Sequence, residues 1–550
     1  MLAFTGALAI YAWGAAPTVL TGDSAEIQTV SLLGGIAHPT GYPTAILAGR
    51  VFGRLLPGDR AHRITMMSAV LGAIAVALVL RLLVELGLSL PGAFAGAMLY
   101  GSTYTFWCSA LRAEVYTWSI SLAVLAIWRT VVALRSGRTG PILVAGFLLG
   151  LTLTGHLTFA LPVAALGLAL AWRLARAARR PVPALVGLAG VFVFGLTPYL
   201  YLMWADTQPQ GMNYLRYVDL GVHPLGPLPP YFDSPWERVG WLITARNKLP
   251  PRLLVVTPHA FARGLFDAAT QFGLFKPGPL GVLLALVGLR RHLAERGGFG
   301  GLFVASCTLA VAFAAALAAG IMTAVFLTPA TLFVCLWAAR GADAVIGWVA
   351  ARRILGAAGG LAAASLLPLV VVLPAQGLRV YAHDHPIGRL RVEVSEEVGL
   401  TGRGLVPSMH GYREPRRYGE AVLAALPESA LVIGHWSELM TLYYLRYVEG
   451  RRPDLAYQPL LFPTMMPRIA SWQRLHGPAG HRFAIVSGVE EVRSYLVGLD
   501  SIAVGAGRWV YLAPTPMAGS GDPVGLAPGP GGSGAAPRDQ RDQRLNPSLR

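Results

Sequence analysis

Long apolar segments separated by short polar stretches recur through the first 375 positions of the chain. A run of about 20 apolar residues can cross the hydrocarbon core of a bilayer as a helix. The pattern therefore predicts a polytopic α-helical membrane protein with about eleven spans. These are residues 2–20, 63–86, 90–109, 115–134, 141–156, 157–173, 183–204, 278–290, 299–319, 321–349 and 354–374.

The composition supports this prediction. Hydrophobic residues make up 54% of the 550 positions and charged residues 13%, whereas soluble domains carry about 25% charged residues. An ordinary cytosolic enzyme, a disordered protein and a secreted disulfide scaffold are therefore excluded. The three cysteines lie in or beside apolar segments, without metal-ligand spacing.

The net charge of +17 resides almost entirely in arginine, since Lys248 and Lys276 are the two lysines of the chain. Many arginines fall in short loops, a distribution typical of membrane proteins rather than of nucleic-acid binding. Basic clusters follow the fourth, sixth, eighth and tenth predicted spans, at 135–138, 173–180, 290–296 and 352–353. All four therefore lie on one face, which the positive-inside rule makes cytoplasmic. The N-terminus is then cytoplasmic, and because it lacks a basic n-region we expect a retained first helix.

Three polar pieces fall on the opposite, outer face: a loop at 21–62, a loop at 205–277 and a soluble domain at 376–515. Two helix-like segments and three strand-like runs predict that this domain is a small α/β unit. They are Tyr418–Leu426 and Ser437–Val448, then Ala430–Gly434, Phe483–Val486 and Trp509–Ala513. The tail 516–550 is rich in Gly, Pro and Arg, and is predicted to be disordered.

The first outer loop begins with Gly22-Asp23-Ser24-Ala25-Glu26. If 23–33 is helical, Asp23 and Glu26 share one face and can act as a base and its orienting partner. In the alternative interpretation, Asp23 only caps the helix and Glu26 is solvated. Residues 1–49 contain no Lys or Arg, so neither acid has a basic partner nearby in the sequence.

Further polar residues occur at the outer ends of spans. His38 and Tyr42, each followed by proline, predict a rigid, irregular backbone that lines a cavity. Arg63 and Arg112 either extend toward lipid headgroups or bind a phosphate. The remaining candidates are Glu114, Tyr116 and His156. For His156 the alternative to a ligand-binding or catalytic role is a purely structural one.

Several of these residues lie in stretches that resemble the motifs of a known protein family. Gly22–Glu26, the stretch Gly35-Ile36-Ala37-His38-Pro39-Thr40-Gly41-Tyr42-Pro43, Ala113–Thr117, Gly155–Thr158 and Pro198–Tyr201 resemble the motifs of the DUF2723 membrane family. That family includes the TMEM260-type protein O-mannosyltransferases, of the GT-C glycosyltransferase superfamily. The similarity runs through about residues 1–375 and resumes weakly at Leu442–Asp454.

The resemblance implies a membrane glycosyltransferase that moves a hexose, mannose in this family, from a polyprenyl-phosphate carrier to an acceptor hydroxyl on the non-cytoplasmic face. The acceptor it implies is a Ser or Thr of a secreted or membrane protein. Asp23 is then the base, with Glu26 or Glu114 supporting it. His38, Tyr42, Tyr116 and His156 contact substrate, while Arg63 and Arg112, joined by Arg246 or Lys248, neutralise the phosphate.

No carboxylate cluster typical of a dedicated Mg²⁺ site occurs, so we expect neither a metal nor a cofactor. The expected location is a bacterial inner (plasma) membrane, with the C-terminal domain extracytoplasmic. The competing hypothesis is a transporter or flippase of a lipid or glycan. Transporters usually carry internal repeats and charged or broken helices at the bilayer midplane, and the sequence shows neither clearly.

Overall fold

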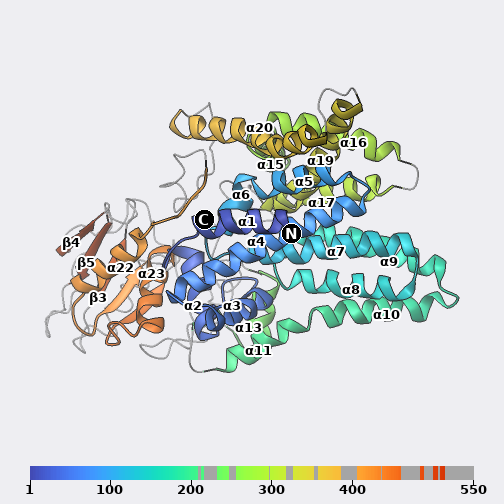
Figure 1. Ribbon diagram of the computed structural model, residues 1–550. Coiled ribbons are helices and arrows are strands. Elements are labelled where there is room, and N and C mark those ends of the chain that lie inside the picture. Colours follow the sequence, from blue (N-terminus) through green and yellow to red (C-terminus); the bar gives the residue numbers. More distant parts are fainter. Residues whose placement is uncertain are drawn as a thin grey trace.

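The computed structural model describes residues 1–208, 212–215, 232–246, 256–295, 298–317, 326–351, 357–385, 406–434, 436–459, 483–487, 500–505 and 508–513. A large helical part is followed by a smaller C-terminal unit that contains a β-sheet (Figure 1). The predicted tail 516–550 and Lys248 lie outside the described residues.

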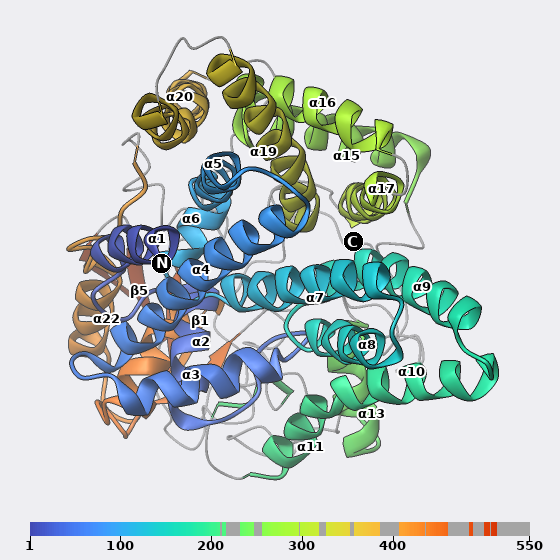
Figure 2. The ribbon, with the colours of Figure 1, turned by 45° about the vertical axis from the view of Figure 1, so that its right-hand side comes forward.

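The helical part begins with α1 (Leu2–Gly14), α2 (Gly22–Leu33), α3 (Pro43–Leu55) and α4 (Arg60–Glu85). It continues with α5 (Leu90–Gly101), α6 (Tyr104–Ala110), α7 (Tyr116–Ser136), α8 (Thr139–Leu153), α9 (Ala160–Ala177), α10 (Pro181–Gly195) and α11 (Leu200–Thr207). Then follow α13 (Pro235–Ile243), α15 (Pro258–Thr270), the π-helical η4 (Gln271–Phe275), α16 (Pro279–Ala294), α17 (Gly300–Leu317), α19 (Thr328–Ala351) and α20 (Ala357–Asp384). Helices α4 and α7 pack against each other through the middle of this part (Figure 2).

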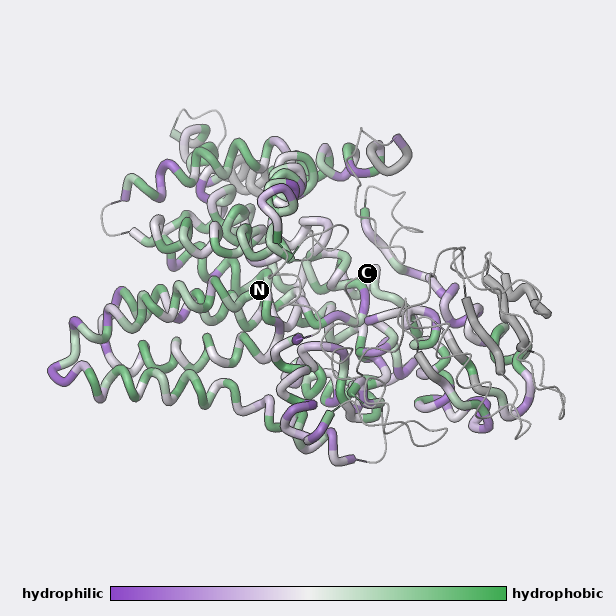
Figure 3. Tube along the Cα trace, turned by 180° about the vertical axis from the view of Figure 1, so that it is seen from behind, coloured by the Kyte–Doolittle hydropathy of each residue, from purple (hydrophilic) through white to green (hydrophobic). Residues whose placement is uncertain are grey.

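Among the described residues, six helices are long and apolar enough to span a membrane, and the chain is an integral membrane protein. They cover Arg60–Glu85, Tyr116–Ser136, Leu157–Ala177, Pro181–Thr207, Gly300–Leu317 and Thr328–Val349. A seventh span is formed if α15–η4 and α16, which bend by 103° at their junction, are counted as one. Hydrophobic residues dominate the helices on the side away from the sheet (Figure 3).

The expected eleven full-length spans are therefore not confirmed, although each predicted segment contains a helix. The first ends at Gly14, because Pro17 disfavours helix in the residue before it. The third is divided into α5 and α6 at Ser102–Thr103. Hydropathy detects apolar composition, but it does not register such breaks.

The C-terminal unit contains a five-stranded sheet in the order β2-β1-β3-β5-β4. Its strands are β1 (Leu431–Gly434), β2 (Ala456–Pro459), β3 (Phe483–Ser487), β4 (Asp500–Gly505) and β5 (Arg508–Ala513). Strand β1 pairs in parallel with β2 and β3, whereas β5 is antiparallel to β3 and β4. The accompanying helices are α22 (Glu414–Ala425), α23 (Trp436–Tyr443) and the π-helical η5 (Tyr444–Val448). The sequence predicted all of these except β2 and β4.

The two parts share a hydrophobic core. Ile27 and Val30 of α2 belong to the same buried cluster as Val422 of α22 and Leu439 of α23. Helix α2 packs against both α23 and η5, and the two parts lie side by side there in Figures 1 and 2. The C-terminal unit therefore packs directly on α2 rather than being attached by a linker alone.

Candidate active site

Helix α2 positions the two candidate carboxylates of the first loop. Gly22 opens the helix with φ of 54°, a conformation that glycine adopts without steric cost. Asp23 follows in the first turn, where the helix dipole favours negative charge. The predicted helix 23–33 is confirmed, and Asp23 and Glu26 point toward the same residue, His38.

His38 joins three oxygen-bearing side chains. Its backbone N–H donates to Glu26 Oε1 at 2.7 Å, and its Nδ1 makes a short contact with Glu26 Oε2. On the other side of the ring, Nε2 lies 3.0 Å from the Tyr42 hydroxyl and 3.8 Å from Asp23 Oδ2. The irregular loop predicted around His38 thus folds back onto α2.

The hydrogen-bond pattern constrains the protons of this cluster. The Tyr42 hydroxyl donates to the Pro39 carbonyl at 2.7 Å, so its oxygen is left to accept from His38 Nε2–H. The contact between His38 Nδ1 and Glu26 then holds one proton shared by the two groups. With Nε2 protonated, the ring donates to the Tyr42 hydroxyl, and the same nitrogen lies 3.8 Å from Asp23 Oδ2.

Burial separates the two carboxylates. The Asp23 side chain is 53% exposed, whereas that of Glu26 is 0% exposed. Burial raises the pKa of Glu26 above its ordinary value, although His38 opposes this effect. Asp23 is therefore the accessible carboxylate, while Glu26 is committed to holding His38.

A row of rings continues from His38. Tyr42 lies edge-on to His38 and stacks on His156, with ring centroids 5.5 Å apart. Tyr116 also contacts His156, and the centroids of these two rings are 4.9 Å apart. Because His156 Nδ1 accepts from the Thr158 N–H at 3.1 Å, the neutral ring carries its proton on Nε2. These residues, from three separate loops, form one wall beside Asp23.

Arg112 and Glu114 form an ion pair next to this wall. Arg112 Nε lies 3.1 Å from Glu114 Oε1, and both side chains are largely buried. Ser68 of α4 fixes the Glu114 backbone by accepting from its N–H and donating to its carbonyl. Glu114 is close enough to Tyr42 to act on it electrostatically, so the pair belongs to the same site.

Two cations that the sequence did not single out lie beyond Arg112. Lys276 and Arg379 are each 2% exposed. The Arg379 guanidinium lies 3.9 Å from the ring centroid of Tyr104, and Arg112, Lys276 and Arg379 all act electrostatically on Cys108. We call these three residues the basic cluster.

Of the two cations that the sequence reasoning missed, Lys276 had a weak signal in the sequence. Lys276 is one of two lysines and lies at the break between η4 and α16. Irregular backbone near membrane depth usually lines a cavity. Arg379 lies in an extension of α20 beyond the predicted span end at residue 374.

The described hydrogen bonds of Arg63 go to backbone carbonyls and not to residues of this site, although the sequence predicted that Arg63 joins Arg112. The Arg63 guanidinium donates to the backbone carbonyls of Gly53 at 3.0 Å and Gly58 at 2.9 Å. It therefore ties the end of α3 to the start of α4. Arg246 is exposed after α13, and no described contact links it to Asp23 or His38.

The ligand-capable atoms of Asp23, Glu26 and His38 lie within 4.8 Å of one another, a set that could hold a divalent cation. Both Glu26 oxygens, however, already contact His38. A cation would have to replace the shared proton of that pair.

The assembled site is an exposed carboxylate backed by a buried carboxylate–histidine pair, with rings and buried cations alongside. Such an arrangement suits a membrane enzyme that activates a hydroxyl beside an anionic group. The family comparison agrees with this class: residues 23–179 match the model described as "Protein O-mannosyl-transferase TMEM260 N-terminal domain". This part of the chain is similar to that domain, and every member of the site except Lys276 and Arg379 lies within the matched residues.

Relatives carry the same description. The protein O-mannosyl-transferase TMEM260 of Mus musculus is 28% identical over 216 residues, which is 36% of this chain and 30% of the mouse protein. The tmem260 protein of Dictyostelium discoideum is 29% identical over 122 residues, 22% of this chain and 13% of that protein. The chain thus matches less than a third of either relative.

Solved structures show a weaker likeness. ArnT from Cupriavidus metallidurans bound to undecaprenyl phosphate aligns with 93% of this chain and 97% of its own, at 11% identity and a TM-score of 0.47. The Archaeoglobus fulgidus oligosaccharyltransferase aligns with 90% of this chain and 69% of its own, at 14% identity and a TM-score of 0.43.

Proposed function

We propose that the protein is a membrane glycosyltransferase that transfers a hexose, mannose by analogy with the named relatives, from a polyprenyl-phosphate donor to a Ser or Thr hydroxyl. The observation that carries this proposal is the exposed Asp23 carboxylate, 3.8 Å from a histidine held by the buried Glu26. It lies in the part of the chain that matches the TMEM260 N-terminal domain. The expected GT-C architecture and the assignment of every site residue are part of the same proposal.

Asp23 acts as the general base. It takes the proton of the acceptor hydroxyl as that oxygen attacks the anomeric carbon, and the bond from that carbon to the phosphate oxygen breaks. A single displacement of this kind inverts the anomeric configuration. The His38 ring lies 3.8 Å from the Asp23 carboxylate and interacts with it by charge, and Glu26 fixes the orientation of the histidine.

The leaving polyprenyl phosphate gains negative charge as the bond breaks. The basic cluster is suited to stabilise it, since buried cations act strongly where the dielectric constant is low. Arg112 belongs both to this cluster and to the ion pair with Glu114. Tyr42, Tyr116 and His156 offer rings and a donor to the sugar.

The arginine-rich loops support a cytoplasmic N-terminus in a bacterial inner membrane. On that orientation α2, the basic cluster and the C-terminal unit face the non-cytoplasmic side. The acceptor there is a secreted or membrane protein. The transporter hypothesis is not favoured, because the matched relatives are named as transferases.

The direct test is transfer of radiolabelled sugar from polyprenyl-phosphate mannose to a Ser/Thr-containing peptide by the purified full-length protein. We expect a protein-dependent, saturable product with inverted configuration. If the protein transfers no sugar from any polyprenyl-phosphate donor but moves the lipid across liposomes, the glycosyltransferase proposal is wrong.

Transfer should survive removal of divalent cations. Both Glu26 oxygens contact His38, so the catalytic cluster is complete with a proton in place of a cation. We expect the rate in excess chelator to stay within about twofold of that in Mg²⁺ or Mn²⁺, a change below about 0.5 kcal/mol in barrier. Loss of transfer that Mn²⁺ restores would show instead that Asp23, Glu26 and His38 bind a metal.

A further inference from the structure

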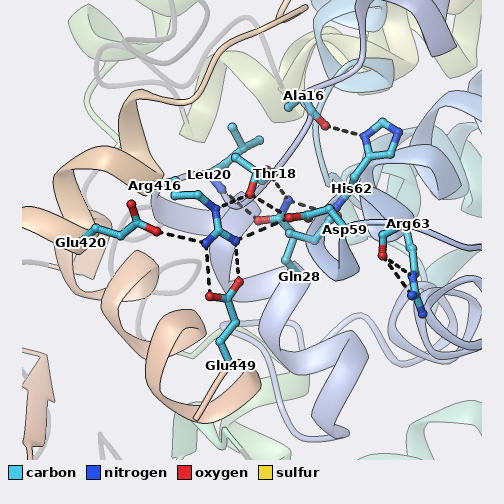
Figure 4. Close-up of polar contacts among 12 residues, drawn as sticks. Ala16, Thr18, Leu20, Gln28, Asp59, His62, Arg63, Arg416, Glu420 and Glu449 are labelled. Carbon is cyan, nitrogen blue, oxygen red and sulfur yellow. Dashed lines mark hydrogen bonds and ion pairs between the residues drawn. The ribbon is translucent and has the colours of Figure 1, made fainter. Parts of the chain in front are cut away.

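The segment that leads into α2 is held by the C-terminal unit at two points. Thr441 of α23 donates to the Leu20 carbonyl at 2.8 Å. Arg416 of α22 donates through Nε to the Thr18 hydroxyl at 2.7 Å (Figure 4). Leu20 is three residues before Asp23, so these bonds act directly on the start of the catalytic helix.

Arg416 also connects α22 to α4 and η5. Its guanidinium lies 3.5 Å from Asp59 Oδ2 and donates two hydrogen bonds to the Glu449 carboxylate in a bidentate arrangement. Asp59 is the N-cap of α4, accepts from the His62 N–H and also accepts from Thr18 at 3.0 Å. The Arg416 side chain of the C-terminal unit therefore contacts both Thr18, in the segment that leads into α2, and Asp59, the N-cap of α4.

Gln28 completes this arrangement from the other side of α2. Its Oε1 accepts from the Leu20 N–H at 3.1 Å. Its amide nitrogen lies 3.4 Å from the Thr18 carbonyl and 3.3 Å from the Ala61 carbonyl. The two backbone groups of Leu20 are thus bound by different elements, and Gln28 and Thr441 are both 0% exposed.

We infer that Arg416 and Thr441 are positioning residues for the transfer reaction, so that the C-terminal unit is a working part of the active site. The inference rests on the proposed function of Asp23. The two side chains touch no reacting atom; they set where α2 begins and therefore where the Asp23 carboxylate lies. Displacing a catalytic group by about 1 Å can cost up to about 10²-fold in rate.

The experiment compares Arg416→Gln and Thr441→Val with Arg417→Gln in the full-length protein. Arg417 is the matched control, because it is the next residue of the same helix, also pairs with an acid and has a side chain that is 71% exposed. Two quantities are measured: hydrogen exchange of the amides in residues 18–26, and steady-state transfer.

We expect Arg416→Gln and Thr441→Val to speed exchange at the start of α2 and to lower kcat about three- to tenfold, with donor KM within twofold. Arg417→Gln should change neither quantity. A purely structural contribution to folding would lower the amount of active protein without faster exchange in the folded fraction.

Unchanged exchange, unchanged kcat or an equal effect of Arg417→Gln overturns the inference. If Arg416→Gln does not fold, Thr441→Val decides, because it removes one hydroxyl and keeps the side-chain shape. If the unmodified protein transfers no sugar, the proposed function fails separately, and the exchange measurement alone decides whether these residues hold α2.

Discussion

Asp23→Asn is expected to lower sugar transfer by at least about 10²-fold, since general-base catalysis is typically worth about 10²–10⁴-fold. Asparagine keeps the size of the side chain at this first-turn position, where Thr21 and not Asp23 is the N-cap, but it cannot take the acceptor's proton. Because the Asp23 side chain is 53% exposed, the change should leave the fold intact. The measurement is kcat with a radiolabelled polyprenyl-phosphate donor, with donor binding determined in parallel.

Glu26→Gln is the informative comparison. It should lower kcat less than Asp23→Asn, because glutamine can still accept from the His38 N–H although it loses the shared proton. Donor binding should be retained in both variants. If Asp23→Asn transfers sugar normally while Glu114→Gln is inactive, Glu114 is the base and Asp23 is not.

The basic cluster should govern donor binding. Arg112→Gln or Lys276→Gln each removes a charge-assisted contact worth about 1.5–3 kcal/mol, which corresponds to a donor KM raised about tenfold or more. The double variant should raise donor KM by about 10²-fold, with a smaller effect on the affinity for the acceptor peptide. Initial rates across donor concentrations measure both constants.

Arg63→Gln is the control for this prediction. Arg63 is a cation near the start of α4, but its guanidinium donates to the Gly53 and Gly58 carbonyls. It should lower the unfolding temperature without raising donor KM. An unchanged KM in Lys276→Gln, or an equal rise in Arg63→Gln, would contradict the assignment of the phosphate to the basic cluster.

Local features of the sequence predicted much of the helical part. Apolar runs located the helices, and with 23–33 taken as a helix the spacing of Asp23 and Glu26 places them on one face. Hydropathy could not show that the segment at 90–109 is broken at Ser102–Thr103, because the break changes conformation and hardly changes composition.

The contacts between distant segments could not be predicted in the same way. Nothing in the local pattern indicates that Glu26 is buried against His38, or that Arg379 of α20 lies over Tyr104. Arg63 and Arg112 look alike in sequence, both at the outer ends of spans. Only the fold separates a cation bound to backbone carbonyls from one beside the catalytic rings.

The shared core between α2 and the C-terminal unit has a consequence for biosynthesis. Thr441 and its partner Leu20 are 421 residues apart, and translation at about 5–20 residues per second separates them by roughly 20–80 seconds. During that interval Ile27 and Val30 lack the apolar neighbours of α22 and α23 that cover them in the finished protein. The helix that carries Asp23 is synthesised early, whereas the helices that pack against it are synthesised late. A nascent or truncated chain therefore has its catalytic carboxylate without the packing that fixes it.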